Sequence, residues 1–269
     1  MFDNIKTIVF DLDGTLYQDF QYHRVFLDIL LEGTDKKAWQ DDLITFVDEV
    51  MDGQHLDMNA FYRSLPMEIE TLPEYLEALK KQIISNLDYQ TALKTNDVLY
   101  MGDIWSVITL IGATLGIFKT KVPNDVYFAT RMIMETYTLP GNTTLYQALL
   151  KAKERFQTVL LSNSQPDAGS RHLNILGFEG AFSEAVYHAQ KPGKLLENLE
   201  KVFPGVTDEP ETILTIGDHA FNDLIPIQAI GGKAIWMNPF PNFKEPQYDL
   251  TFSTLEELAE FLNTLGCCK

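Results

Sequence analysis

Hydrophobic and polar positions divide the chain into three stretches. Residues 5–10 form a short run of β-branched and aromatic residues, typical of a strand that is buried on both faces. From His23 onward the apolar residues recur at helical spacing for more than a hundred positions. Beyond Pro140 and Gly141, short apolar runs alternate with amphipathic segments. The pattern therefore predicts one strand, then a helical module, then a region of alternating strands and helices.

The helical module contains several segments with one apolar face. Val25, Phe26, Ile29 and Leu30 mark the first of them. Further helices are predicted at residues 43–50, 58–65, 73–85, 104–118 and 125–137. Residues 104–118 are uncharged and mostly apolar, but they are fewer than the roughly 20 residues that a membrane span requires. We therefore expect a buried helix or an oligomer contact there, and no membrane segment.

The last stretch alternates in the manner of an α/β domain. Helices are predicted at residues 143–155, 167–176, 194–202 and 255–265, and buried strands at residues 158–161, 213–216 and 234–237. Such alternation indicates right-handed crossovers and a parallel sheet that is covered on both faces. The first strand has no partner nearby, so it must pair with strands that follow the module. We therefore predict an α/β core from residues 1–16 and 139–269, interrupted by an insert at 17–138.

Polar residues follow each predicted strand. Asp11 and Asp13 come after the first strand, and Ser162 and Asn163 come after the second. The third is followed by Gly217-Asp218, and a Lys191-Pro192 pair stands between the second and the third. Because the carboxyl ends of parallel strands meet at one edge of a sheet, we expect these side chains to converge on one site.

The charge and composition of the chain limit the kinds of molecule that it is expected to bind and the compartment in which it is expected to work. The formal net charge of −17 argues against nucleic acid or an anionic membrane, and an anionic small substrate would need a local cation. Cys267 and Cys268 are adjacent, so they neither close a loop nor offer a metal-ligand spacing. The N-terminus enters the first strand without room for a signal peptide, so we expect a cytoplasmic protein.

The order of these motifs resembles a known family. Asp-x-Asp-Gly-Thr at residues 11–15, Ser162-Asn163, Lys191-Pro192, and Gly217-Asp218 with Asp223 five residues later are similar to the haloacid dehalogenase superfamily. The insert directly after the first motif resembles that family's helical cap. The resemblance implies a doubly wound, Rossmann-like parallel sheet with an inserted all-helical cap domain. It also implies a Mg²⁺-dependent phosphatase.

A metal site is consistent with the residue types alone. Asp11, Asp13 and Asp218 offer the hard oxygen ligands that Mg²⁺ prefers, and clustered carboxylates without a cation would repel one another. By the resemblance, Asp11 and Asp218 bind the ion through their side chains, and Asp13 binds it through its backbone carbonyl. Asp223 and Asn222 would orient the metal site without binding the ion directly.

The resemblance also implies catalytic roles. Asp11 would attack phosphorus and form an aspartyl-phosphate, and Asp13 would act as general acid and then as general base. Family members that cleave carbon–halogen bonds lack an acid at the position of Asp13, which points to phosphate esters here. Lys191 would neutralise the charge on Asp11 and on the phosphoryl group. The groups that would bind the substrate are Ser162, Asn163 through its backbone N–H, Gly14 and Thr15.

Simpler interpretations of single residues remain. Ser162 and Asn163 also suit a helix N-cap, and Lys191 suits a solvated surface. His188 and His219 are more often loop residues than catalysts.

The expected substrate is a small phosphorylated metabolite, either a nucleotide, a sugar phosphate or phosphoglycolate, bound by a monomer or a cap-mediated homodimer. The alternatives are a phosphomutase that uses the same chemistry and a non-catalytic binding protein on the same fold.

Overall fold

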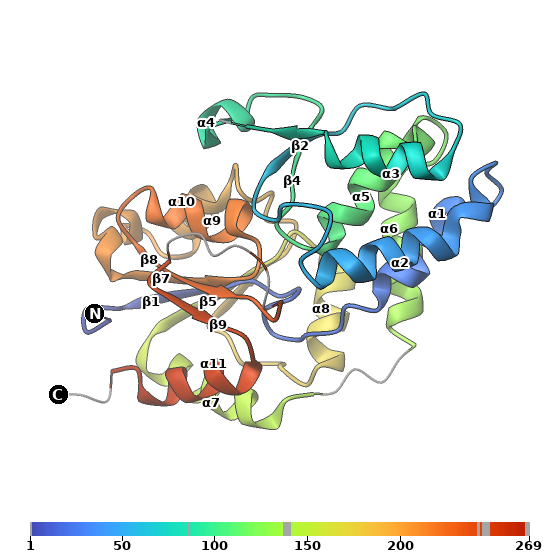
Figure 1. The fold of residues 1–269 in the computed structure, drawn as a ribbon. Helices are drawn as coiled ribbons and strands as arrows, with labels where there is room; N and C mark the ends of the chain where they lie inside the picture. Colours follow the sequence, from blue (N-terminus) through green and yellow to red (C-terminus); the bar gives the residue numbers. More distant parts are fainter. Residues whose placement is uncertain (1, 86, 137–140, 241–242, 244–247, 267–269) are drawn as a thin grey trace. The chain divides into compact units, whose positions relative to one another are not determined.

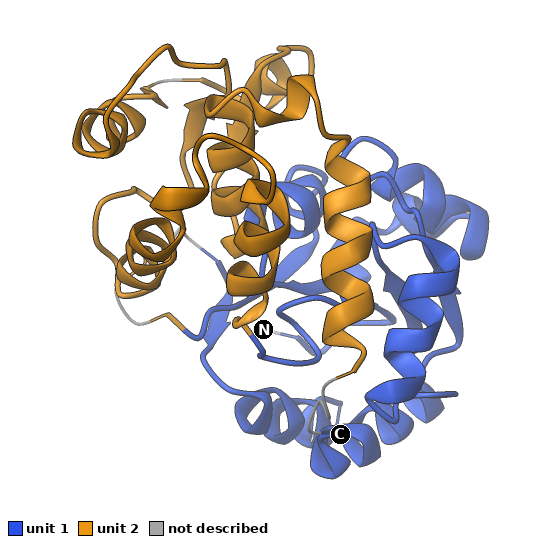
Figure 2. Ribbon diagram, turned by 90° about the vertical axis from the view of Figure 1, so that its right-hand side faces the viewer, with its two compact units in different colours: residues 1–19, 138–239, 245–269 blue, residues 20–137, 240–244 orange. Residues whose placement is uncertain are grey.

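The computed structural model of the chain describes residues 2–85, 87–136, 141–240, 243 and 248–266. It divides into two compact units, shown in different colours in Figure 2. The core unit comprises residues 1–19, 138–239 and 245–269, and the insert unit comprises residues 20–137 and 240–244.

The core unit contains a six-stranded sheet in which every pair of neighbouring strands is parallel. Its order is β6-β5-β1-β7-β8-β9. The strands are β1 (Thr7–Phe10), β5 (Gln157–Leu161), β6 (Glu184–Val186), β7 (Ile213–Gly217), β8 (Lys233–Met237) and β9 (Leu250–Phe252), and all but β6 are labelled in Figure 1. The predicted parallel sheet is confirmed.

Strand β1 lies in the middle of this sheet. Val9 is paired with Val159 of β5 on one side and with Thr215 of β7 on the other, so the first strand does pair with strands that follow the insert. All four residues of β1 are buried. Ile8 and Phe10 belong to one hydrophobic cluster and Val9 to another, because successive side chains point to opposite faces.

Helices cover both faces of the core sheet (Figure 1). The cluster of Ile8 and Phe10 also contains residues of α7 (Thr143–Arg155), α8 (Pro166–Ile175) and α11 (Leu255–Thr264). The cluster of Val9 contains residues of α9 (Leu195–Val202) and α10 (Ile225–Gln228). A five-residue π-helical turn, Ala220–Leu224, follows β7 and precedes α10. The doubly wound α/β core is thus confirmed.

The insert unit is mainly helical. Its helices are α1 (Tyr22–Leu31), α2 (Gln40–Met51), α3 (Leu72–Lys80), α4 (Tyr89–Ala92), α5 (Ile104–Thr114) and α6 (Pro123–Met134). Helix α1 packs against α2, α5 and α6. Most residues of α5 are buried, which favours the buried helix among the expectations for this segment. Among the described residues, we find no helix with the length and apolar character that crossing a membrane demands.

The expectation of an all-helical insert was wrong. Strands β2 (Phe61–Arg63), β3 (Ile83–Ile84) and β4 (Val98–Tyr100) form a small antiparallel sheet with β2 in the centre. Strand β2 lies where a helix was predicted at residues 58–65. Its aromatic residues favour a strand once a partner is available: Phe61 is paired with Tyr100, and their rings are in edge-to-face contact at 5.0 Å.

The other predicted helices differ mainly at their ends. The predicted helix 73–85 stops at Lys80, because the chain turns there into β3. Helix α6 ends at Met134. Tyr137, Cys267 and Cys268 lie outside the described residues.

Candidate active site

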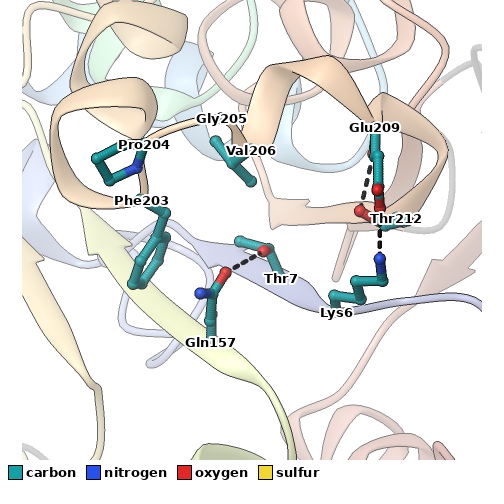
Figure 3. Close-up of a pocket in the computed structure, with 9 residues that line it drawn as sticks. All are labelled: Lys6, Thr7, Gln157, Phe203, Pro204, Gly205, Val206, Glu209 and Thr212. Atoms are coloured by element: carbon teal, nitrogen blue, oxygen red, sulfur yellow. Dashed lines mark hydrogen bonds and ion pairs between the residues drawn. The ribbon is translucent and has the colours of Figure 1, made fainter.

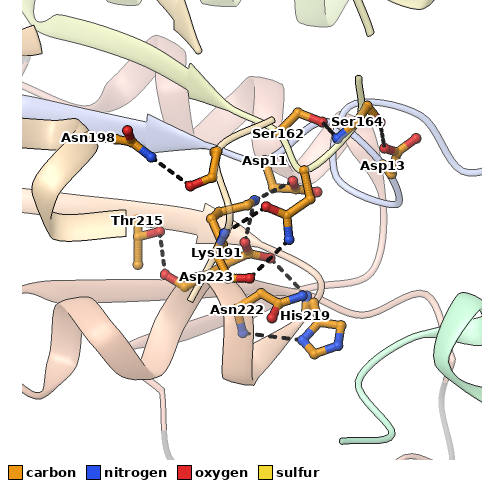
Figure 4. A network of polar contacts seen from close by, with 12 residues as sticks. Asp11, Asp13, Ser162, Ser164, Lys191, Asn198, Thr215, His219, Asn222 and Asp223 are labelled. Atoms are coloured by element: carbon orange, nitrogen blue, oxygen red, sulfur yellow. Dashed lines mark hydrogen bonds and ion pairs between the residues drawn. The ribbon is translucent and has the colours of Figure 1, made fainter. Parts of the chain in front are cut away.

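A buried lysine between two carboxylates occupies the carboxyl edge of the core sheet. The Nζ atom of Lys191 lies 2.6 Å from Oδ1 of Asp11, which directly follows β1, and 2.6 Å from Oδ1 of Asp223 (Figure 4). The three side chains are at most 10% exposed. Such burial excludes the interpretation of Lys191 as a solvated surface residue.

The pKa values of this group reflect its burial. Burial raises the pKa of Asp11 to about 7, with further upward contributions from Asp223 and Asp13, although the Lys191 ammonium opposes the change. Burial lowers the pKa of Lys191, but the two adjacent carboxylates raise it by more, so it ends above its ordinary value. Lys191 is therefore charged at neutral pH, and burial together with the neighbouring carboxylates makes Asp11 bind a proton more strongly than an exposed aspartate does.

Asp218 joins the same cluster from the end of β7. Carboxylate oxygens of Asp11, Asp218 and Asp223 all lie within 4.8 Å of one another. The close approach of Asp218 depends on Gly14, where φ is +77° and where a Cβ atom would lie 2.0 Å from Oδ2 of Asp218. The indole Nε1 of Trp236 donates a hydrogen bond of 2.7 Å to the backbone oxygen of Asp218. Gly14 therefore makes room for a carboxylate.

These residues fit a divalent cation. Three carboxylates beside one ammonium leave an excess of negative charge, and carboxylate oxygens are ligands that Mg²⁺ prefers. Asp223 is less available than the others, because Oδ1 accepts from Lys191 and Oδ2 accepts from the backbone N–H of His219 at 3.2 Å. Asp11 and Asp218 are thus the best placed side-chain ligands, and Asp223 is suited to holding the lysine.

Asp13 is held by a different set of groups. The Tyr17 hydroxyl donates to Oδ1 of Asp13. The Ser164 hydroxyl donates to Oδ2 of Asp13 at 3.0 Å (Figure 4). The backbone N–H of Ser164 donates in turn to the Ser162 hydroxyl at 3.1 Å. Ser162 is fully buried and is linked to Asp13 through Ser164. The sequence pattern did not identify Tyr17 or Ser164 as partners of Asp13.

Asn163 contacts Lys191 through the backbone of the lysine. Its side-chain Oδ1 accepts from the Lys191 N–H at 2.7 Å, and its Nδ2 donates to the Lys191 carbonyl at 3.1 Å. Helix α8 starts only at Pro166, with Gln165 at its N-cap position. The interpretation of Ser162 and Asn163 as helix caps is therefore wrong.

The remaining predicted residues lie around this cluster. Thr15 is fully buried, and its hydroxyl lacks a hydrogen-bond partner among the residues described. The N–H of Asn222 donates to Nδ1 of His219 at 3.3 Å. The ring nitrogens of His188 lie 3.2 and 3.0 Å from the amides of Gln165 and Gln190. Both histidines therefore have partners within their own loops.

A separate pocket of about 200 Å³ lies at the opposite edge of the core sheet (Figure 3). Lys6 and Thr7 at the start of β1, Gln157 at the start of β5 and Thr212 before β7 are among its lining residues. It contains no residue of the acidic cluster, so we do not assign it to the same site.

A family model of haloacid dehalogenase-like hydrolases matches residues 5–231 of the chain. No curated protein matches the chain. The match extends from before β1 to beyond α10, and so includes Asp11, Lys191 and Asp218.

Solved structures with a similar fold include a putative hydrolase, a putative mutase and a dehalogenase. The putative HAD-hydrolase YfnB from Bacillus subtilis, bound to magnesium, is 18% identical, with a TM-score of 0.54 and coverage of 97% of this chain and 99% of that chain. A putative β-phosphoglucomutase from Thermotoga maritima is 16% identical, with a TM-score of 0.52 and coverage of 97% and 100%. The L-2-haloacid dehalogenase from Xanthobacter autotrophicus is 15% identical, with a TM-score of 0.52 and coverage of 96% and 98%. At these identities the similarity shows the fold.

Proposed function

The chain belongs to the haloacid dehalogenase-like hydrolases, and from this premise we propose that it is a Mg²⁺-dependent phosphatase acting on a small phosphomonoester. The observation that carries the proposal is the buried Asp11 carboxylate beside Lys191 and Asp218, with a second acid, Asp13, two residues further on. The acid at position 13 favours a phosphatase over a dehalogenase, because the carbon–halogen hydrolases of the family lack it.

In the proposed reaction, an oxygen of Asp11 attacks phosphorus while the bond from phosphorus to the leaving oxygen breaks. Asp13 gives its proton to that oxygen, so an alcohol departs. A water molecule then loses a proton to Asp13 and attacks phosphorus, which releases inorganic phosphate and restores Asp11. Bound by Asp11 and Asp218 and by the Asp13 carbonyl, Mg²⁺ would supply positive charge to the phosphoryl group.

The proposed phosphate contacts come from groups at the same edge of the sheet. Lys191 is charged and already beside Asp11, where it would offset negative charge in the transition state. The Ser162 hydroxyl and the Asn163 backbone N–H would hold phosphoryl oxygens, together with Gly14 and Thr15. The buried Thr15 hydroxyl supports this assignment, since a buried donor without a partner is unfavourable unless a ligand supplies one. We further propose that the insert, residues 17–138, acts as a cap that contacts the leaving group.

The test is to replace Asp11 by asparagine. Asp11→Asn should fold normally but lose Mg²⁺-dependent release of phosphate from 4-nitrophenyl phosphate, whereas Asp208→Asn, at an exposed position of the core unit, should keep it. Retained turnover in Asp11→Asn rules out the proposed nucleophile. A phosphomutase would use the same two acids, but it would return the phosphoryl group to a sugar phosphate, so release of inorganic phosphate in stoichiometric amounts distinguishes the two.

A further inference from the structure

Both oxygens of the Asp13 carboxylate accept hydrogen bonds from hydroxyl groups. Tyr17 donates to Oδ1 and Ser164 donates to Oδ2. Tyr17 and Ser164 are each only 4% exposed, so water competes little for these hydroxyls. The three residues belong to the core unit. They therefore form a contact network within one compact unit of the fold.

Each donor is itself fixed by other contacts. The backbone of Tyr17 forms a β-bridge with Asp13, and its ring packs against the ring of His172 in α8, with centroids 4.6 Å apart. Ser164 donates its N–H to the Ser162 hydroxyl and accepts at its carbonyl from the His188 N–H at 2.8 Å. The two hydroxyls thus reach Asp13 from separate, independently anchored segments.

We propose that Tyr17 and Ser164 are positioning residues that hold the Asp13 carboxylate in the orientation needed for proton transfer to the leaving oxygen. This inference rests on the proposed function, in which Asp13 is the general acid. An aspartate side chain rotates about two bonds, and a hydrogen bond to each oxygen fixes both rotations. As the general acid, Asp13 carries a proton on one oxygen; that oxygen can still accept from its hydroxyl partner while its O–H points to the leaving oxygen, so neither bond excludes proton transfer.

The effect of removing the Tyr17 and Ser164 hydroxyls should therefore depend on the leaving group of the substrate. Proton transfer requires donor and acceptor within about 2.6–3.2 Å, so a carboxyl group free to rotate loses part of the general acid effect. An alkoxide is a poor leaving group and needs that proton, whereas 4-nitrophenolate departs without it. The ratio kcat/KM covers the steps up to phosphoryl transfer to Asp11, before water reacts. It therefore isolates the acid role of Asp13 from its later role as base.

The experiment compares Tyr17→Phe, Ser164→Ala and the double variant on 4-nitrophenyl phosphate and benzyl phosphate. We expect kcat/KM for benzyl phosphate to fall at least about tenfold in each single variant, and kcat/KM for 4-nitrophenyl phosphate to change less than about threefold, since general acid catalysis contributes about 10²–10⁴-fold. Tyr146→Phe and Ser170→Ala remove hydroxyls that bond to the backbone elsewhere in the core unit, and they should change neither substrate.

The ratio of the two kcat/KM values is insensitive to the fraction of enzyme that folds, because unfolding lowers both equally. An equal fall for both substrates, or no fall for either, overturns the positioning role and leaves the phosphatase proposal standing. If the wild-type chain shows no Asp11-dependent turnover of either ester, the phosphatase proposal fails, and the positioning role fails with it.

Discussion

Gly14 illustrates how one residue without a side chain controls the geometry of the acidic cluster that is proposed to bind Mg²⁺. Any Cβ at this position would occupy the place of Oδ2 of Asp218, and φ lies in the left-handed region. We expect Gly14→Ala to weaken Mg²⁺ binding at least about tenfold, because losing or displacing a ligand or its support has effects of about 10–100-fold. Isothermal titration calorimetry measures this directly.

Gly180→Ala is the matched control for that substitution. Its φ is +75°, but nothing lies within 4 Å of the added Cβ. The control should therefore lose about 1 kcal/mol of stability from backbone strain while binding Mg²⁺ normally. Equal Mg²⁺ affinity in both variants and the wild type would contradict the assignment of Asp218 as a ligand.

The raised pKa of Asp11 predicts that Mg²⁺ binding releases a proton. With a pKa of about 7, Asp11 is mostly protonated at pH 6 and mostly ionised at pH 8. The ion must displace the proton at the lower pH, so its affinity should strengthen about tenfold over this range and level off above it. Titrations in buffers of different ionisation enthalpy count the protons released. A Kd that is constant from pH 6 to pH 8 contradicts the prediction.

At this scale, the sequence indicated which groups meet but not how they are oriented. The polar residues after successive strands do come together, since Lys191 touches Asp11 and Asp218 lies in the same cluster. The bonds from Tyr17 and Ser164 to Asp13 depend on side-chain rotamers and on loop paths. Side-chain rotamers and loop paths do not produce a periodic pattern in the sequence, so they could not be predicted from it. The roles assigned to the individual residues remain predictions.

Among the elements, the loop that carries Lys191 depends on the segment after β5. Backbone N–H groups of His188 and Ala189 donate to the carbonyls of Ser164 and Ser162, at 2.8 and 2.9 Å. The Asn163 amide adds two bonds to Lys191 itself. Residues 162–164 therefore hold the loop of Lys191 through backbone hydrogen bonds, as a neighbouring strand would.

Replacing Asn163 by alanine tests this anchoring. The backbone N–H proposed to bind phosphate remains, but both bonds to Lys191 are lost, so kcat should fall about tenfold with little change in KM. Lys191 should also react faster with acetic anhydride, as measured by peptide mass spectrometry. Asn142→Ala, which removes the N-cap of α7, serves as a control with normal labelling. A raised KM without faster labelling shows instead that the Asn163 side chain binds substrate.

Short elements were the least predictable ones. Strands β2, β6 and β9 have three residues each, too few to display a two-residue period. In contrast, helix α7 begins and ends at residues 143 and 155, as its amphipathic pattern predicted. A long, buried element can be predicted from its own sequence pattern. A short edge strand cannot, because it forms only when a neighbouring strand supplies hydrogen bonds.

For the whole molecule, the net charge of −17 predicts opposite salt effects on the two ligands. Screening weakens repulsion of a phosphate ester and attraction of Mg²⁺, since the Debye length falls to about 8 Å at 0.15 M salt. Between 20 and 200 mM NaCl, as rough limits, KM for 4-nitrophenyl phosphate at saturating Mg²⁺ should fall and the Kd of Mg²⁺ should rise. Kinetics and calorimetry measure the two constants. A KM that rises with salt indicates that the local charge of Lys191 outweighs that of the chain.

The α/β core was predictable because the pairing of its strands follows from the pattern of the whole chain. A buried run at residues 5–10 without a nearby partner had to find one after the insert, and β1 does pair with β5 and β7. The small sheet of the insert unit was not predictable in this way. Its strands are too short for their pattern to require partners.

The central place of β1 has a consequence for biosynthesis. A ribosome makes β1 first, but one of its neighbours, β7, ends some 200 residues later, a delay of about 10–40 s at 5–20 residues per second. Throughout that interval Ile8, Val9 and Phe10 lack at least one of the two strands that pair with β1 in the finished fold, since β5 ends at residue 161 and β7 at residue 217. Nascent chains of this protein are therefore expected clients of ribosome-associated chaperones until translation has passed Gly217.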